Sequence, residues 1–232
     1  MPMTPFITIT TDLGDNFAIS QLKAVIFTLG FTGQIIENHD VSSFSIVEGA
    51  YGIWQLAKYC PQNTIHVGIV DPGVGSKRNG IVIKTNNFWF VGPDNGLFWE
   101  AASQDGILQS WKIDESYFGS VSTTFHGRDV FVKIAVLLSE NKYPEDFGCR
   151  SIKNIKKLEF KNGQVLHIDK YGNAKIFGNK TFDLPVVETF SDVNPGQPLI
   201  LNGSSDLLEL AVNLKSAKDY FGLKLSQVIQ HL

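Results

Sequence analysis

An α/β fold is predicted by two patterns that follow one another along the chain. The first part alternates strand-like and helix-like segments, which is typical of βαβ units with a largely parallel sheet. The last part contains short strand-like runs about every ten residues, which favours a small barrel or sandwich. We therefore expect a Rossmann-like, largely parallel N-terminal domain over residues 1–148 and a small C-terminal β-barrel or sandwich domain over residues 149–232.

Hydrophobic periodicity predicts the first elements in order. β-Branched and apolar runs indicate strands, and apolar side chains repeated at helical spacing indicate helices, the first of which Asp15 or Asn16 would cap. The strands are expected at residues 6–11, 34–37 and 65–70, and the helices at residues 17–26 and 45–58.

Two further strands, at residues 81–85 and 88–91, are joined by Asn86 and Asn87, which suits a hairpin turn. A helix is expected to begin near Asp129. In the second domain the expected strands lie near residues 164–168, 174–177, 185–190 and 199–201.

Composition excludes several classes of partner. The net charge of −3 gives no basic surface for nucleic acid or an anionic membrane, and no run of about 18 apolar residues suggests a membrane span. Cys60 and Cys149 have no metal-binding or redox spacing, so both are expected to be buried free thiols, and the five histidines are not spaced as ligands. We expect a cytoplasmic protein that acts on a small molecule, without metal or cofactor.

The loop at residues 69–78 is the strongest candidate for a site. It follows an apolar strand, presents Asp71, turns through Pro72 and two glycines, and returns with Arg78. Ligands of open α/β sheets bind outside the carboxyl ends of the strands, and glycine lets the backbone approach a ligand. The alternative is a tight loop in which the aspartate only caps its own backbone.

Six such polar segments occur in an order that resembles one family. They are TTDLG (10–14), VDPGVG (70–75), PDNG (93–96), FHGRD (125–129), IDKYGN (168–173) and NGSS (202–205). Over nearly its whole length the chain resembles the S-adenosylmethionine hydroxide adenosyltransferases, which are relatives of fluorinase and chlorinase.

The resemblance implies a displacement at C5′ of S-adenosyl-L-methionine in which water attacks, giving adenosine and L-methionine. The aspartate, arginine and histidine that hold this water in the family match Asp71, Arg78 and His126. On its own, His126 could instead be a helix-start histidine bonded to backbone. The halogenating relatives carry tyrosine at the positions of Asp71 and His126, and fluorinase carries serine at Gly127, which favours water over halide here.

Residues that hold the substrate are also implied by the resemblance. Asp12 would accept hydrogen bonds from the ribose diol and Phe44 would lie beside the nucleoside, whereas a loop cap and a core phenylalanine are the alternatives. Asp94 and Asn95 are expected to bind substrate as well. The family's second acid is either Asp15 or replaced by Asn16.

In the second domain the resemblance implies contacts with methionine and adenine. Asp169, Tyr171 and Asn173 would hold the methionine ammonium and stack on adenine, and Ser204 would contact the methionine carboxylate. A plain β-turn is the alternative for Asp169 and Asn173.

Assembly and activity complete the expectations. The family forms trimers in which the active site lies between the first domain of one subunit and the second domain of its neighbour, so a homotrimer is expected. The competing functions are a non-catalytic protein that binds adenosine or S-adenosylmethionine and, less favoured, a 5′-halogenating adenosyltransferase.

Overall fold

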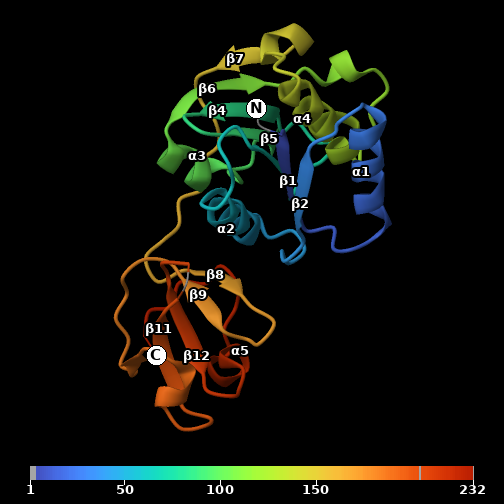
Figure 1. Cartoon of the computed structure of the whole chain (residues 1–232). Coiled ribbons are helices and arrows are strands. Elements are labelled where there is room, and N and C mark those ends of the chain that lie inside the picture. The colour runs from blue at the N-terminus through green and yellow to red at the C-terminus, as the bar shows by residue number, and fades with distance from the viewer. Residues whose placement is uncertain (1–3, 204, 232) are drawn as a thin grey trace. The chain divides into compact units, whose positions relative to one another are not determined.

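The computed structural model describes residues 4–203 and 205–231 and divides into two units between Leu158 and Glu159 (Figure 1). The first unit contains a seven-stranded sheet in the order β2-β1-β3-β5-β4-β6-β7. Its strands are β1 (Phe6–Thr11), β2 (Gln34–Asn38), β3 (Ile65–Ile69), β4 (Gly80–Thr85), β5 (Trp89–Pro93), β6 (Ile107–Lys112) and β7 (Arg150–Ile152). Strands β2, β1, β3 and β5 pair in parallel, while β4 and β7 run against their neighbours, which confirms the mostly parallel sheet.

Helices cover both faces of this sheet. They are α1 (Phe17–Thr28), α2 (Ile46–Ala57), α3 (Trp99–Asp105) and α4 (Val132–Ser139). Helix α1 packs beside α4, and α2 packs beside α3 (Figure 1). Because strand side chains alternate between faces, Ile7 and Ile9 enter the core shared with α1 and α4, while Thr8 and Thr10 point to the other face. The sequence did not predict α3 or β6.

Side-chain caps begin the first two helices. The Asn16 side chain accepts a hydrogen bond from the Ala18 N–H at 2.8 Å, and Ser45 Oγ accepts one from the Glu48 N–H at 3.2 Å. Each cap satisfies a backbone donor that the helix itself leaves unpaired. The N-cap expected at the start of α1 is therefore Asn16.

The last strand of the sheet extends the first unit past residue 148. Strand β7 pairs antiparallel with β6, and the Lys156 N–H donates to Asp94 Oδ1 at 2.7 Å. The boundary found in the structure lies after Leu158 because these contacts hold residues 149–158 against the first sheet.

A buried histidine lies inside the sheet. His66 Nδ1 is 2.8 Å from Thr8 Oγ1, and the His66 ring stacks on Phe90 with 5.1 Å between centroids. The side chain is fully buried, and this burial lowers the pKa of His66 from 6.5 to about 3.

Acid should destabilise the fold through this histidine. Between pH 6.5 and about 3 the unfolded chain binds a proton on His66 that the folded chain does not, so the free energy of unfolding falls as the pH decreases. The contribution approaches about 1.4 kcal/mol per pH unit. Urea unfolding across this range should show a shallower pH dependence for His66→Gln than for the wild type, and equal slopes would contradict the assignment.

The second unit contains a five-stranded sheet in the order β10-β11-β12-β9-β8. Its elements are β8 (Val165–Ile168), β9 (Ala174–Ile176), β10 (Val186–Val187), β11 (Pro198–Asn202), β12 (Leu208–Val212) and α5 (Ala217–Phe221). Strand β12, which the sequence did not predict, pairs with both β11 and β9 and buries Leu210. A separate core of apolar side chains fills this unit.

Both cysteines are free thiols. Burial raises the pKa of Cys60 to about 11 and that of Cys149 to about 12, so neither is a reactive thiolate at neutral pH. Among the described residues, no helix is both long enough and apolar enough to span a bilayer.

Candidate active site

Asp71 emerges at the carboxyl end of β3, where the sequence predicts a site. The chain turns tightly after it, with the Val74 N–H donating to the Asp71 carbonyl at 3.1 Å. Gly75 has φ +73°, and a Cβ there would lie 2.3 Å from the Thr123 carbonyl oxygen. Only glycine fits that position, because the backbone of the loop passes directly against a second loop.

Arg78 returns to Asp71 and binds it through several atoms. Arg78 Nε lies 3.0 Å from both carboxylate oxygens of Asp71, and Arg78 Nη2 lies 2.5 Å from Oδ2. The two side chains are only 10% and 8% exposed, so the pair is largely withdrawn from solvent. A guanidinium that engages both oxygens fixes the orientation of the carboxylate.

His126 joins this pair from another part of the chain. His126 Nδ1 lies 2.9 Å from Arg78 Nη2, and its side chain is 8% exposed. The residue immediately precedes η2 (Gly127–Phe131), a π-helical turn that runs into α4. Such turns are rare in proteins, and those that occur are often found at functional sites. The structure thus brings together all three residues predicted to hold the attacking water.

The loop that carries His126 is braced by an adjacent ion pair. Arg128 Nε donates to Asp129 Oδ1 at 2.7 Å and Nη2 donates to Oδ2 at 3.0 Å. Asp129 also accepts from the Ser122 N–H, and the nearby Arg128 lowers the pKa of Asp129. The charged end of the FHGRD segment is therefore engaged with its own neighbours in the chain and does not line the cavity.

A cavity of about 200 Å³ opens beside the three side chains. Its lining comprises Asp12, Leu13, Phe44, Ile69, Asp71, Val74, Thr124, Phe125, His126 and Gly127. Asp12 Oδ2 accepts a hydrogen bond from the Phe44 N–H at 2.7 Å, and Phe44 itself is 72% exposed with φ +65°. Asp12 and Phe44 thus line the same cavity as Asp71 and His126, and Phe44 is not a core residue.

Asp94 and Asn95 lie outside the lining of this cavity. The Asn95 amide donates to the Val70 carbonyl at 2.9 Å and Asn95 Oδ1 accepts from the Leu97 N–H at 3.1 Å, so this residue holds the backbone next to Asp71. Burial raises the pKa of Asp94. Their predicted contact with substrate stays a prediction, as does that of Asp15, which is exposed.

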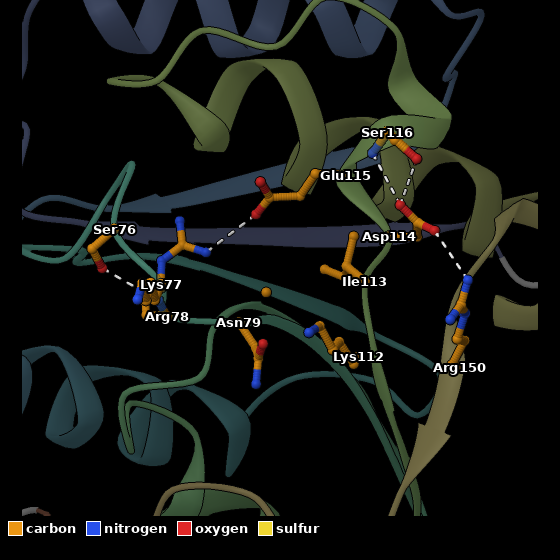
Figure 2. A pocket seen from close by; sticks show the side chains of 11 residues that line it. Ser76, Lys77, Arg78, Asn79, Lys112, Ile113, Asp114, Glu115, Ser116 and Arg150 are labelled. Atoms are coloured by element: carbon orange, nitrogen blue, oxygen red, sulfur yellow. Dashed lines mark hydrogen bonds and ion pairs between the residues drawn. The ribbon is translucent and has the colours of Figure 1, made fainter.

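Glu115 is a fourth polar member of the site that sequence reasoning missed. Its Oε1 lies 3.1 Å from His126 Nδ1. The same oxygen lies 3.5 Å from Arg78 Nη1, the contact drawn in Figure 2. Glu115 follows β6, which runs in the same direction as β3, so both strands deliver an acid to the same edge of the sheet. A prediction of β6 would have been the signal needed to find it.

The predicted residues of the second unit lie around a different cavity. Tyr171 and Asn173 line a cavity of about 590 Å³. Asp169 holds the backbone of both residues: its Oδ1 accepts hydrogen bonds from the Tyr171 and Asn173 N–H groups at 2.9 and 3.0 Å. Asp169 therefore forms the turn that the sequence offered as the alternative, and Ser204 lies outside the described residues.

Within residues 4–203 and 205–231, no group of three or more histidine, cysteine, aspartate or glutamate side chains is arranged to hold a metal ion. What the first unit offers instead is a carboxylate, a guanidinium and an imidazole at the carboxyl edge of an α/β sheet. This combination defines a class of protein that positions a small polar reactant, such as water, beside a bound small molecule.

Family models identify the family within that class. The model of the SAM hydroxide adenosyltransferase N-terminal domain matches residues 7–148, and the model of the corresponding C-terminal domain matches residues 163–230. The chain belongs to the S-adenosylmethionine hydroxide adenosyltransferase family.

Individual relatives agree with this assignment. The chain is 37% identical to an (R)-S-adenosyl-L-methionine hydrolase of Methanocaldococcus jannaschii, over 72% of this chain and 64% of that protein. It is 30% identical to the Salinispora tropica protein of the same name over 96% of both chains, and 20% identical to a fluorinase of an Actinoplanes species over 95% of both. A crystal structure of an uncharacterized conserved protein from Thermotoga maritima superposes with a TM-score of 0.86 at 28% identity, covering 95% of this chain and 98% of that one.

Gly127 is the position at which the resemblance implies a serine in fluorinase. A Cβ at Gly127 would lie 2.8 Å from Ile69 Cγ2 and 3.0 Å from Ile69 Cδ1. Gly127→Ser should therefore lower the free energy of unfolding by about 1–3 kcal/mol, as overpacking typically does. In a double-mutant cycle with Ile69→Ala the two losses should be less than additive, and full additivity would show that the clash is not the cause.

Proposed function

We propose that this chain hydrolyses S-adenosyl-L-methionine to adenosine and L-methionine. The single observation that carries the proposal is the convergence of Asp71, Arg78 and His126 at the cavity edge in a chain of this family. The names of its relatives supply the substrate class.

The chemistry needs little from the protein beyond positioning. The water oxygen forms a bond to C5′ as the C5′–S bond breaks. The electron pair of the C5′–S bond passes to sulfur, and the water loses a proton. The leaving group is a neutral thioether, so the reaction requires neither a general acid nor, in this proposal, a metal or cofactor. The buried carboxylate and imidazole would orient the water and receive its proton, and positioning of this kind lowers barriers by as much as about 7–11 kcal/mol.

Water is preferred to halide because of Asp71. Its carboxylate borders the cavity, and two like charges about 4 Å apart repel by about 4 kcal/mol at an effective dielectric constant of 20. A chloride or fluoride ion would meet that repulsion, whereas water would gain a hydrogen-bond acceptor.

The relatives' names also specify a configuration. In their names the L descriptor already fixes the α-carbon of methionine, so (R) designates the sulfonium sulfur. We therefore propose that the (R) sulfonium diastereomer is the preferred substrate.

The test is to incubate the purified protein with each sulfonium diastereomer, with and without chloride, and to separate the products by chromatography with mass detection. Adenosine plus methionine, unaffected by chloride and faster from the (R) form, is expected. A chloride-dependent 5′-chloroadenosine would overturn the choice of nucleophile. Calorimetric binding without any product would overturn hydrolysis in favour of a non-catalytic binding protein.

A homotrimer with a shared active site is also part of this proposal. The cavity of about 200 Å³ in the first unit is smaller than the roughly 300–1,000 Å³ that usually encloses a ligand of this size. A substrate held there would need further walls, and the cavity lined by Tyr171 has the aromatic surface to supply them. A cytoplasmic location remains a prediction.

A further inference from the structure

Hydrolysis of a sulfonium by water releases one proton, and the following inference rests on the proposed hydrolysis. The three side chains expected to hold the water are at most 10% exposed, so they have little direct contact with bulk solvent. A proton taken from the water therefore needs a path out of the site.

Two contacts of one nitrogen indicate such a path. His126 Nδ1 lies 2.9 Å from Arg78 Nη2, which only donates hydrogen bonds, and 3.1 Å from Glu115 Oε1, which as a carboxylate only accepts them. A single ring nitrogen cannot serve both partners in one protonation state. With a proton on Nδ1 it donates to Glu115 and leaves Nε2 free as a base, and without that proton it accepts from Arg78.

Glu115 connects this nitrogen to a second cavity. Its side chain is 34% exposed, and together with Arg78 it lines a second cavity of about 410 Å³ (Figure 2). Neither residue lines the cavity of about 200 Å³ beside Asp71 and His126. Lys77, Lys112 and Arg150 contribute cationic side chains to the lining of the second cavity, against the acids Asp114 and Glu115. A cavity of this size with a polar lining accommodates water.

The position of Glu115 is fixed locally. It opens the short 3-10 turn η1 (Glu115–Phe118), and the preceding Asp114 caps this turn by accepting from the Ser116 N–H at 3.2 Å and from Ser116 Oγ at 2.6 Å. The cap holds Glu115 beside the imidazole instead of leaving it on a free loop.

We propose that Glu115 is the positioning residue that sets the tautomer of His126 and conducts the proton out of the site. As C5′–O forms and C5′–S breaks, the water O–H bond breaks and its proton moves to His126 Nε2. The proton on Nδ1 then passes to Glu115 Oε1, and from there to water in the second cavity. Arg78 donates to the vacated Nδ1, and the ring regains its starting tautomer by exchange with solvent between turnovers.

The test compares Glu115→Gln and Glu115→Ala with the wild type. Glutamine retains the size of the side chain but cannot take a proton, so kcat should fall by about 10–100-fold with KM nearly unchanged. Formate or acetate, small enough for the second cavity, should restore the kcat of Glu115→Ala in proportion to its concentration. Glu140→Gln is the matched control: it neutralises an exposed acid of the same unit that lines neither cavity, and it should leave kcat unchanged.

A second measurement does not depend on turnover. Nitrogen-15 NMR of labelled histidine should show the proton of His126 on Nδ1 in the wild type and on Nε2 in Glu115→Ala. An unchanged tautomer, wild-type kcat in Glu115→Gln, or a loss of kcat that small acids do not restore would each overturn the proposal. Failure of the hydrolysis itself would appear separately, as an absence of adenosine with the wild-type protein.

Discussion

Replacing Asp71 by asparagine should lower kcat by about 10²–10⁴-fold, the usual contribution of a positioned acid–base group. The amide has the same shape but turns one oxygen of the Arg78 contact into a donor that faces guanidinium N–H groups. The same change removes the negative charge that orients the attacking water. Steady-state adenosine release should show the loss in kcat, with calorimetric affinity for the substrate changed far less.

Asp146→Asn provides the matched control for this variant, because Asp146 is an exposed acid of the same unit that lines neither cavity. It should retain wild-type turnover. If Asp71→Asn instead raised KM with kcat unchanged, Asp71 would be a binding residue and the assignment of the water-holding site would fail.

Two inactive variants should restore activity when they share one trimer. Asp71→Asn disables the first unit, and Tyr171→Ala removes an exposed aromatic side chain from the cavity of the second unit. If each active site combines units from neighbouring subunits, random mixing by co-expression leaves about a quarter of the sites with both units intact. The mixed enzyme should then reach about a quarter of wild-type kcat, far above either variant alone.

The control pairs Asp71→Asn with His126→Ala, which both lie in the first unit. No mixed site then contains an intact first unit, so activity should stay at the level of the single variants. Absence of recovery in the first mixture, with trimers verified by native mass spectrometry, would show that each chain builds its site alone.

Local patterns predicted the parts of the site that lie close together in sequence. Asp71 and Arg78 share one loop, so a strand end, two glycines and an arginine were enough to indicate their pairing. His126 was matched only through the resemblance, since nothing local marks a histidine before a helix. Glu115 could not be predicted, because its place depends on the direction of β6, and that depends on strand pairing across the sheet.

Local patterns also leave open whether Asp169 of the second unit and Asn95 of the first bind substrate. An aspartate two and four residues before backbone donors forms a turn whatever its function, and Asp169 does so here. Asn95 likewise uses both ends of its amide on neighbouring backbone. The sequence indicates that such polar side chains form hydrogen bonds in a turn or a site. It does not show whether their hydrogen-bonding groups are used by a ligand or by the backbone of the chain itself.

The pairing of β7 with β6 has a practical consequence for dissecting the protein. A fragment that stops at residue 148, where the match to the N-terminal family model ends, would lack β7 and leave one side of β6 with unpaired backbone N–H and C=O groups. Exposed strand edges of this kind recruit strands from other molecules and promote aggregation. A fragment ending at residue 158 keeps that edge covered, and it is the one we expect to stay monodisperse.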